Sequence, residues 1–331
     1  MSLSLSGISF LATKALRLKG KKLSGLVFQQ ISMMKTGYVA IIGLPNTGKS
    51  SLLNCLLGQK ISIVTSKPQT TRKRILGILS EKDYQIIFLD TPGLVKPSYL
   101  LHEKMLEHID TSIEDADVIV LTFDVSSDEK IKESLENEII QKIISQNQCP
   151  IILALNKVDM ITQEKSIELV NQFTNQGKFK AVVPISAGFN FNLKSLLENV
   201  IELLPEGHKL YDDDILSEET ERFFVSEIIR EKVFELYEDE IPYSTEVIIA
   251  DFKERAKGKD FISAEIIVER ESQKPIIIGK EGKAIKKLGQ VARKSVEEFL
   301  GREVFLELRV KVKEKWRSNE KFLKSLGYAI K

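Results

Sequence analysis

The segment from Gly43 to Ser50 has the composition of a loop that binds phosphate groups. It fits the pattern G-x-x-x-x-G-K-[ST] with the residues Gly43, Leu44, Pro45, Asn46, Thr47, Gly48, Lys49 and Ser50. Glycines let the backbone wrap around a phosphate, and successive N–H groups at a helix start supply positive potential. Lys49 can reach the β- and γ-phosphates, and the Ser50 hydroxyl can ligate Mg²⁺. Because ATPases, GTPases and nucleotide kinases share this pattern, it predicts a nucleotide site and leaves the base open.

A second group of residues follows an apolar run and can contact the same phosphates: Asp90, Thr91, Pro92 and Gly93. We expect Asp90 to hold Mg²⁺ through its water shell and the Gly93 N–H to approach the γ-phosphate. A strand that simply ends in a Pro-Gly turn would contain the same residues. The phosphate loop upstream favours the nucleotide interpretation.

A third group also follows an apolar run and can select the base: Asn156, Lys157, Val158 and Asp159. The Asp159 carboxylate can accept hydrogen bonds from N1–H and the exocyclic amine of guanine. Adenine offers neither in that arrangement, so Asp159 would reject ATP because its own charge would stay unpaired. Lys157 would lie over the base. Farther along the chain, Ser186 and Ala187 would bring the Ala187 N–H close to guanine O6.

Between the phosphate loop and Asp90 lies the segment Lys67-Pro68-Gln69-Thr70-Thr71-Arg72. A threonine here can ligate Mg²⁺ only when the γ-phosphate is present, so this segment would act as an ordering switch. We favour Thr71 over Thr70 as that ligand. The predicted Mg²⁺ ligands are therefore Ser50, Thr71 and Asp90.

Short apolar runs rich in β-branched residues place these motifs at the ends of predicted strands. The runs are 38–43, 84–90, 118–124 and 151–156, with a weaker one at 181–185. Helical patterns lie between them, for example at 50–57, 101–116 and 130–145. Alternating strands and helices predict an α/β doubly wound domain with a parallel sheet, which binds ligands at the carboxyl ends of its strands.

The composition changes after residue 204. Residues 205–219 include Pro205, Gly207 and a run of three aspartates, which predicts a polar linker. The chain is then acidic in balance over 206–260 and basic over 274–317. This asymmetry indicates a second domain with a surface suited to a polyanion, although a solvated helix face would give the same pattern.

A G-x-x-G loop, Gly279-Lys280-Glu281-Gly282, lies in this second region between a strand-like run at 276–278 and a basic helix. With an alternating strand at 303–312 after it, the loop is typical of a KH domain, which clamps about four nucleotides of single-stranded RNA. On its own, such a loop is usually a surface turn. The expected RNA contacts are Ile278, Gly279, Lys280, Glu281, Gly282, Lys283, Lys286 and Lys287. We expect Trp316 to pack in the core rather than stack on a base.

These motifs, in this order and with 67–72 as the switch, resemble the Era family of TrmE–Era–Septin-like GTPases. The resemblance covers about residues 36–327. It implies a doubly wound P-loop GTPase domain at 36–204 and, after the linker at 205–219, an α+β type II KH domain at 220–327. It further implies slow hydrolysis of GTP to GDP, binding to the 3′ end of small-subunit (16S-type) ribosomal RNA, and assistance to assembly of the 30S-type subunit. Family members associate peripherally with the inner membrane, and we expect a cytoplasmic monomer.

Leu94 lies where Ras-like proteins have the glutamine that orients the attacking water. An aliphatic side chain cannot do this, so the water must be positioned by the backbone, another residue or a cation. In some relatives an asparagine of the phosphate loop ligates K⁺, and Asn46 occupies the matching position. We therefore expect Lys49, Thr71 and Asn46 to be the catalytic residues, with Mg²⁺ as cofactor and K⁺ as a candidate for a second cation.

The first 33 residues carry lysines and arginine but no acidic residue, in a chain of 331 residues whose net charge is +1. Four explanations fit these residues: a start site assigned too early, a disordered tail, an organellar transit peptide, or a basic tail at a membrane surface. The location therefore stays open between cytoplasm and organelle. Three functions compete with the Era interpretation: an RNA-binding scaffold that uses GTP only for folding, an ATP-using phosphotransferase, and a related GTPase with another target.

Overall fold

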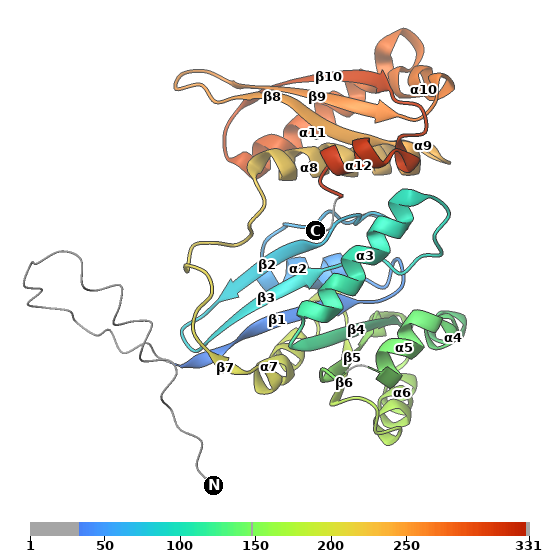
Figure 1. Cartoon of the computed structure of the whole chain (residues 1–331), viewed down its shortest axis with the longest axis vertical. Helices are drawn as coiled ribbons and strands as arrows, with labels where there is room; N and C mark the ends of the chain where they lie inside the picture. The colour runs from blue at the N-terminus through green and yellow to red at the C-terminus, as the bar shows by residue number, and fades with distance from the viewer. Residues whose placement is uncertain (1–32, 147, 329–331) are drawn as a thin grey trace, which may run out of the picture. The chain divides into compact units, whose positions relative to one another are not determined.

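The computed structural model of the protein describes residues 33–146 and 148–328 (Figure 1). Within them, a seven-stranded sheet has the order β2-β3-β1-β4-β5-β6, and a short β7 pairs with β1. The strands are β1 (Met34–Ile42), β2 (Ile75–Ser80), β3 (Tyr84–Asp90), β4 (Val118–Asp124), β5 (Ile151–Asn156), β6 (Ala181–Ile185) and β7 (Glu206–Gly207). Neighbouring strands are parallel except where β2 meets β3 and β7 meets β1.

Helices cover both faces of this sheet. They are α2 (Lys49–Leu57), α3 (Leu100–Asp115), α4 (Asp128–Glu136), α5 (Glu138–Gln146), α6 (Gln163–Asn175) and α7 (Leu193–Leu203). One hydrophobic cluster joins the sheet to α2 and α7 through residues such as Leu52 and Leu196. A second cluster packs α3 to α6 onto the opposite face through residues such as Ile109 and Phe173. Successive β1 residues alternate between the two clusters, as the pleat of a strand requires.

The strands predicted at 84–90, 118–124, 151–156 and 181–185 are present with these bounds, and the first strand begins earlier than predicted, at Met34. Two expectations are wrong. The sheet is mixed rather than parallel, because β2 joins β3 as an antiparallel neighbour. The single helix predicted at 130–145 is divided into α4 and α5, because the Asn137 side chain accepts hydrogen bonds from the N–H groups of Ile139 and Ile140, both at 3.1 Å, and so starts a new helix.

Residues 205–219 are fastened to strands β1, β3 and β2 of the large sheet. β7 pairs with the start of β1. The Gln85 side-chain oxygen accepts hydrogen bonds from the N–H groups of Leu210 (2.7 Å) and Tyr211 (2.9 Å). The Leu216 carbonyl accepts a hydrogen bond of 2.8 Å from the Ile78 N–H. This polar segment is therefore held by backbone and side-chain hydrogen bonds.

The C-terminal domain has a three-stranded sheet of order β10-β9-β8. Its strands are β8 (Glu246–Lys253), β9 (Asp260–Val268) and β10 (Val304–Val312), and β9 is antiparallel to β8 but parallel to β10. Its helices are α8 (Glu221–Leu236), α9 (Ile241–Ser244), α10 (Lys274–Ile278), α11 (Lys283–Leu300) and α12 (Glu320–Ser325). Residues of α8 and α11, such as Ile229 and Val296, pack with the sheet in one core.

The run predicted to be strand-like at 276–278 is instead the end of helix α10. Pro275 occupies the first turn, where a missing N–H costs nothing. Gly279 ends the helix with φ 71°, and its N–H donates to the Pro275 carbonyl at 2.8 Å. Ile277 is fully buried, and its carbonyl accepts a hydrogen bond of 2.8 Å from the Tyr237 hydroxyl. The apolar run is thus partly core, and Ile276 is its exposed member.

Candidate functional site

A cavity of about 370 Å³ lies at the carboxyl end of β1, between the phosphate loop and the switch segment. The phosphate loop, residues 43–50, joins β1 to α2. The lining residues come from this loop and the residue after it, from the segment 63–71 and from three later positions: Pro45, Asn46, Gly48, Lys49, Ser50, Ser51, Ile63, Val64, Thr65, Ser66, Gln69, Thr70, Thr71, Gly93, Lys130 and Lys157. The cavity thus collects residues of three predicted motifs and extends to Lys157 of the fourth.

The backbone of the phosphate loop depends on its glycines. Gly48 has φ 90°, and a Cβ there would lie 2.3 Å from the Asn156 side-chain nitrogen. A Cβ at Gly43 would lie 2.5 Å from the Thr122 carbonyl oxygen. Both positions therefore require glycine, as the loop pattern predicts.

Lys49 is buried inside the loop. Its Nζ donates to the carbonyls of Gly43 (3.1 Å) and Leu44 (2.8 Å). Burial lowers the pKa of Lys49 to about 8, although the nearby Asp90 carboxylate opposes this. A bound phosphate would supply the negative charge that this buried ammonium group lacks.

Ser50, Thr71, Asp90 and Ser62 form a cluster of hydroxyls around one carboxylate. Asp90 Oδ2 accepts hydrogen bonds from Ser50 Oγ (2.8 Å) and Ser62 Oγ (2.7 Å). Thr71 Oγ1 lies 2.8 Å from Ser50 Oγ. All three predicted Mg²⁺ ligands therefore meet at one point. The neighbouring Thr70 is turned elsewhere and bonds to Thr65 and to the Lys67 carbonyl.

The carboxyl group of this cluster fits a divalent cation. Among the described residues, Asp90 Oδ1 is buried and has no hydrogen-bond partner. Burial raises the pKa of Asp90, although the hydrogen bonds from Ser62 and Ser50 and the charge of Lys49 oppose this. A buried oxygen without a partner is costly, and a cation would satisfy it. Oxygen ligands of this kind suit Mg²⁺.

The segments after β5 and β6 meet at the other end of the site. Asn156 Nδ2 donates to the Thr47 carbonyl (2.7 Å), and Asn156 Oδ1 accepts from the Ala187 N–H (3.0 Å). Lys157 has φ 70°, and its Nζ contacts Asp124 Oδ2 at 2.7 Å. Asp159 is exposed in the short turn 158–160. The Ala187 N–H, expected to face guanine O6, is thus used by Asn156 here, and the preceding Ser186 is buried.

Two further expectations concern the residues beside the phosphates. Leu94 is 3% exposed and belongs to the hydrophobic core below the site, and its N–H donates to the Gly43 carbonyl at 3.2 Å. Asn46 has φ 62°, and its side-chain amide donates to the Ser66 carbonyl at 3.0 Å. Asn46 therefore connects the phosphate loop to the residue just before the switch segment. Thr91 and Pro92 line the start of the turn that brings Gly93 against Pro45.

The G-x-x-G loop lies between α10 and α11. Gly279 has φ 71°, and a Cβ there would lie 2.5 Å from the Ala284 Cβ. Gly282 has φ 73° with open space beside it, and Glu281 also has a positive φ, 54°. The loop therefore brings its backbone to the surface in a conformation that few side chains tolerate.

The lysines of this region differ in their partners. Lys283 forms an ion pair of 2.8 Å with Glu281, which offsets part of the positive charge predicted for the loop. Lys280, Lys286 and Lys287 are exposed and form no ion pair within the described part of the chain. Ile278 is half-buried beside them. Trp316 is fully buried and donates from Nε1 to the Ser244 carbonyl at 2.8 Å, so it packs in the core as predicted.

Comparison with known proteins identifies the family. Residues 38–157 match a family described as 50S ribosome-binding GTPase, and residues 240–317 match the KH domain family. The chain is 47% identical over 299 residues to the chloroplastic GTPase ERA1 of Zea mays, covering 89% of this chain and 70% of that protein. It is 45% identical over 293 residues to the GTPase Era of Geotalea daltonii, covering 88% and 97%. The chain belongs to the Era family of GTPases.

Solved structures of Era have the same fold. A crystal structure of Era in complex with MgGDPNP and nucleotides 1506-1542 of 16S ribosomal RNA is 39% identical, with a TM-score of 0.83, and covers 90% of this chain and 100% of that one. A tyrosine-to-alanine variant of Aquifex aeolicus Era bound to GDP.AlF4- gives the same values. The expected combination of a doubly wound P-loop GTPase domain and an α+β KH domain is confirmed, and so is the expected GTPase class.

The sequence patterns did not predict two residues of the site in this Era-family GTPase, Ser62 and Asp124. Ser62 lies in a segment with no recognisable pattern, and only the fold brings it to Asp90. Asp124 ends β4, as Asp90 ends β3, and this position at the carboxyl end of a strand was an available signal. Burial raises the pKa of Asp124, but hydrogen bonds from Lys157, Ser126 and Lys130 outweigh it and lower the value to about 2. Asp124 therefore anchors Lys157 as a carboxylate.

The relatives come from both chloroplasts and bacteria. Over the described residues, no helix combines the length and the apolar character needed to cross a bilayer. The basic segment predicted at 1–33 as a tail or transit peptide lies outside the described residues, apart from Met33.

Proposed function

We propose that this GTPase is a GTP-driven switch that binds small-subunit ribosomal RNA of the 16S type and assists assembly of that subunit from its precursor. One observation carries this proposal: a single chain combines the hydroxyl cluster around Asp90, beside a phosphate loop, with a G-x-x-G loop flanked by exposed lysines. The relation to an Era bound to both MgGDPNP and 16S RNA nucleotides supports it.

In this proposal the backbone N–H groups of residues 43–50 bind the phosphates of GTP, and Lys49 lies beside the β- and γ-phosphates. Ser50, Thr71 and Asp90 would hold Mg²⁺, which neutralises charge on the phosphates when bound. At the base, Asp159 accepts hydrogen bonds from guanine and Lys157 covers the ring. Asn156 keeps the base loops aligned with the phosphate loop through its bonds to Thr47 and Ala187.

Hydrolysis proceeds without a glutamine in this proposal, because the side chain at position 94 is a buried leucine. Asn46 already contacts the Ser66 carbonyl, just before the switch segment. A K⁺ ion ligated by the Asn46 side-chain oxygen and by switch carbonyls would place positive charge beside the phosphates, where charge develops during the reaction. Turnover is therefore expected to be faster in K⁺ than in Na⁺, and equal rates would contradict the role of Asn46.

RNA binding is assigned to the G-x-x-G loop. The backbone at Gly279 and Gly282 would lie against the sugar-phosphate chain, and Lys280, Lys286 and Lys287 would contact phosphates. Ile276 and Ile278 would border the groove for unstacked bases. The chain is expected to act as a monomer. Its location is cytoplasmic, with peripheral inner-membrane association, unless residues 1–33 direct it to an organelle.

The test uses the full-length protein, GTP and an RNA with the 3′-terminal sequence of 16S ribosomal RNA. We expect GTP turnover that is lost in Lys49→Ala, and RNA binding that is tighter with a non-hydrolysable GTP analogue than with GDP. Turnover that survives in Lys49→Ala would contradict the assigned site. RNA binding without any GTP turnover would support the scaffold function instead.

The base assignment has a separate test. Replacing Asp159 by asparagine exchanges an acceptor for a donor, so Asp159→Asn should bind xanthosine nucleotides better and guanosine nucleotides worse. An unchanged preference, or use of ATP by the wild-type protein, would favour an ATP-using phosphotransferase. Crosslinking to an unrelated RNA as efficiently as to the 16S sequence would point to a GTPase with another target.

A further inference from the structure

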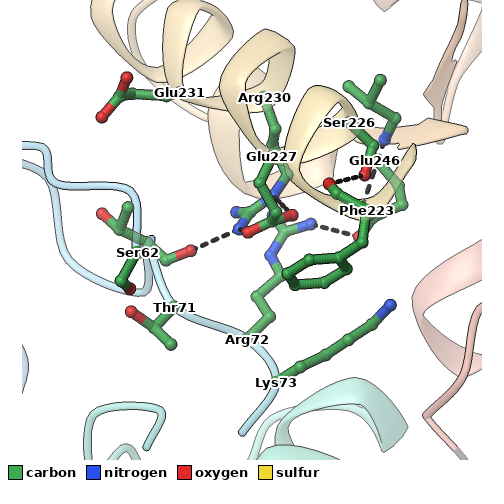
Figure 2. Close-up of polar contacts among 12 residues, drawn as sticks. Ser62, Thr71, Arg72, Lys73, Phe223, Ser226, Glu227, Arg230, Glu231 and Glu246 are labelled. Carbon is green, nitrogen blue, oxygen red and sulfur yellow. Dashed lines mark hydrogen bonds and ion pairs between the residues drawn. The ribbon is translucent and has the colours of Figure 1, made fainter. Parts of the chain in front are cut away.

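The switch segment connects the nucleotide site directly to the KH domain. Thr71 Oγ1 lies 2.8 Å from Ser50 Oγ, in the cluster beside the phosphate loop. The next side chain, Arg72, is only 3% exposed and leaves the segment toward the KH domain, where it lies beside Arg230 (Figure 2). Two adjacent residues therefore contact the two domains.

Arg72 occupies a socket made of backbone carbonyls and one carboxylate. Its Nη1 donates to the Thr245 carbonyl (2.7 Å) and to Glu246 Oε2 (3.0 Å), and its Nη2 donates to the carbonyls of Pro242 and Tyr243, both at 3.1 Å. We call these four groups the Arg72 socket. The planar fork of a guanidinium can satisfy all of them at once, whereas a lysine cannot.

The carboxylate of the socket is itself held by other groups. Glu246 Oε2 accepts a hydrogen bond of 3.1 Å from the Tyr328 hydroxyl. Burial raises the pKa of Glu246, but Arg72, Arg230 and Lys73 outweigh this and hold it below its usual value. Glu246 is therefore ionised, and removing Arg72 would leave a buried charge poorly compensated.

Helix α8 holds residues that precede Thr71 in the chain. Arg230 Nη2 donates to the Thr70 carbonyl at 2.7 Å, and Lys67 Nζ donates to the Phe234 carbonyl at 2.8 Å. Glu231 accepts a hydrogen bond of 3.0 Å from the Val64 N–H. Arg230 and Glu231 are each 1% exposed, so the polar side of α8 is buried against the switch segment as well.

We infer that the Arg72 socket makes the KH domain part of the γ-phosphate sensor, with Arg72 as the positioning residue that holds Thr71 at the nucleotide site. This inference rests on the proposed GTP-driven function. Consecutive Cα atoms are about 3.8 Å apart, so Thr71 cannot leave the cluster without displacing the backbone at Arg72. When Thr71 is bound to Mg²⁺ and the γ-phosphate, the socket is occupied. When the γ-phosphate is lost, Thr71 is released and the socket loosens.

Linkage makes this coupling reciprocal. If the γ-phosphate tightens the socket, then an intact socket must raise the affinity for GTP by the same factor. GDP lacks the group that Thr71 senses, so its affinity should depend little on the socket. Coupling energies between sites typically correspond to about 5- to 150-fold in affinity.

Trp316, the one tryptophan of the chain, reports on the socket. The Arg72 guanidinium lies 5.7 Å from the centre of its ring, and Trp316 Nε1 donates to the Ser244 carbonyl at 2.8 Å, next to the socket residues. Its intrinsic fluorescence therefore follows the docking of Arg72 without any label.

The experiment records Trp316 emission of the full-length protein with Mg²⁺ and either GDP or a non-hydrolysable GTP analogue. We expect emission at longer wavelength with GDP, because the loosened socket lets water reach the indole. Both nucleotides bound with identical emission would overturn the inference while leaving the proposed function intact. A wild-type protein that binds neither nucleotide would instead refute the proposed function, and this inference with it.

Four variants sharpen the test. Arg72→Ala and Arg72→Lys should lose the nucleotide-dependent change in emission and bind the GTP analogue about 10-fold more weakly, with GDP affinity changed by less than about 2-fold. Glu246→Gln keeps the shape of the socket and removes its charge. It should therefore lose less of the emission change and less of the affinity for the GTP analogue than Arg72→Ala does. Because it keeps the shape of the side chain, it still tests the inference if Arg72→Ala misfolds. Arg74→Ala, which removes a half-buried arginine that is paired with Asp115 and lies outside the socket, is the matched control and should behave as wild type. Equal weakening of GDP and GTP binding in Arg72→Lys and Glu246→Gln would indicate a purely structural role and overturn the inference.

Discussion

The side-chain amide of Asn156 donates a hydrogen bond of 2.7 Å to the Thr47 carbonyl, so the loop after β5 is fastened to the loop that binds phosphate. The same side chain accepts a hydrogen bond of 3.0 Å from the Ala187 N–H after β6. One buried asparagine thus joins three segments that lie far apart in the sequence. Its amide supplies both the donor and the acceptor that this arrangement needs, which no aspartate or alanine can do.

Asn156→Ala should weaken the binding of GTP and GDP alike, by about 100-fold, because a buried donor and acceptor each lose a partner at about 1–3 kcal/mol. Fluorescent nucleotide titration measures both affinities. Asn199→Ala is a matched control, since within the described ranges that amide bonds only to the Ser195 carbonyl one helical turn away. A selective loss of GTP binding would contradict this explanation, because the Asn156 bonds involve no γ-phosphate.

Ser62→Ala should raise the Mg²⁺ concentration needed for half-maximal GTP turnover by about 3- to 10-fold. Ser62 Oγ donates one of the two hydrogen bonds to Asp90 Oδ2, and a net hydrogen bond to a charged group contributes about 1.5–3 kcal/mol. Without it the carboxylate is harder to keep ionised in its buried position. Turnover is measured at fixed GTP over a series of Mg²⁺ concentrations. An unchanged half-saturation point would mean that Ser62 does not tune Asp90.

The buried Lys49 makes nucleotide binding take up protons at alkaline pH. Its pKa is lowered from 10.5 to about 8 by burial, so it is largely neutral in the free protein at pH 8.5, and phosphate binding should restore its charge. We expect uptake of about 0.8 proton per GTP at pH 8.5 and about 0.1 at pH 7. Calorimetry in buffers of different ionisation enthalpy measures this. Lys49→Arg stays charged and should take up none.

The lowered pKa of Lys49 also determines how its contribution to the free energy of unfolding changes with pH. The unfolded chain binds the Lys49 proton up to about pH 10.5, whereas the folded protein releases it near pH 8. Since the unfolded state binds more protons between these values, the Lys49 contribution to the free energy of unfolding rises with pH in that window. Below pH 8 Lys49 is charged in the folded protein, and the cost of burying that charge lowers the free energy of unfolding by its full amount. Lys49→Met should remove this dependence and stabilise the nucleotide-free protein at pH 7.

The motif-bearing strands could be predicted because both their faces are buried, which demands unbroken apolar runs bounded by polar residues. Where the apolar or helical pattern predicted the wrong element, the chemistry of individual capping and turn residues determined the structure. Asn137 caps a new helix within a continuous helical pattern, and Pro275 followed by Gly279 turns a β-branched run into helix α10. In both places one or two residues with strong backbone preferences overrode the periodicity.

The chemistry of the site was predictable where function fixes the spacing of residues and obscure where the fold alone brings them together. Ser50 and Asp90 belong to recognisable motifs. Ser62, by contrast, reaches Asp90 only through the course of the segment after α2. Arg72 was visible as part of the switch, but three of the four groups in its socket are backbone carbonyls, and a backbone carbonyl carries no signature in the sequence.

RNA binding by the G-x-x-G loop should depend on Lys286 and Lys287 mainly through charge. Replacing both by alanine removes two exposed cations near the start of α11, so the slope of log affinity against log salt concentration should fall by up to about 1.4, or 0.7 per phosphate contact. Lys294→Ala is the matched control, because it lies on the same helix and is paired with Glu298. Gly282→Asp should abolish binding, since a side chain there meets open space but carries a negative charge toward the RNA, and its positive φ of 73° should lower stability moderately. Gly279→Asp should also unfold the loop, because its Cβ would lie 2.5 Å from that of Ala284. Filter binding over a salt series, with thermal unfolding of each variant, separates these effects. Full RNA affinity in Gly282→Asp would remove the loop from the RNA site.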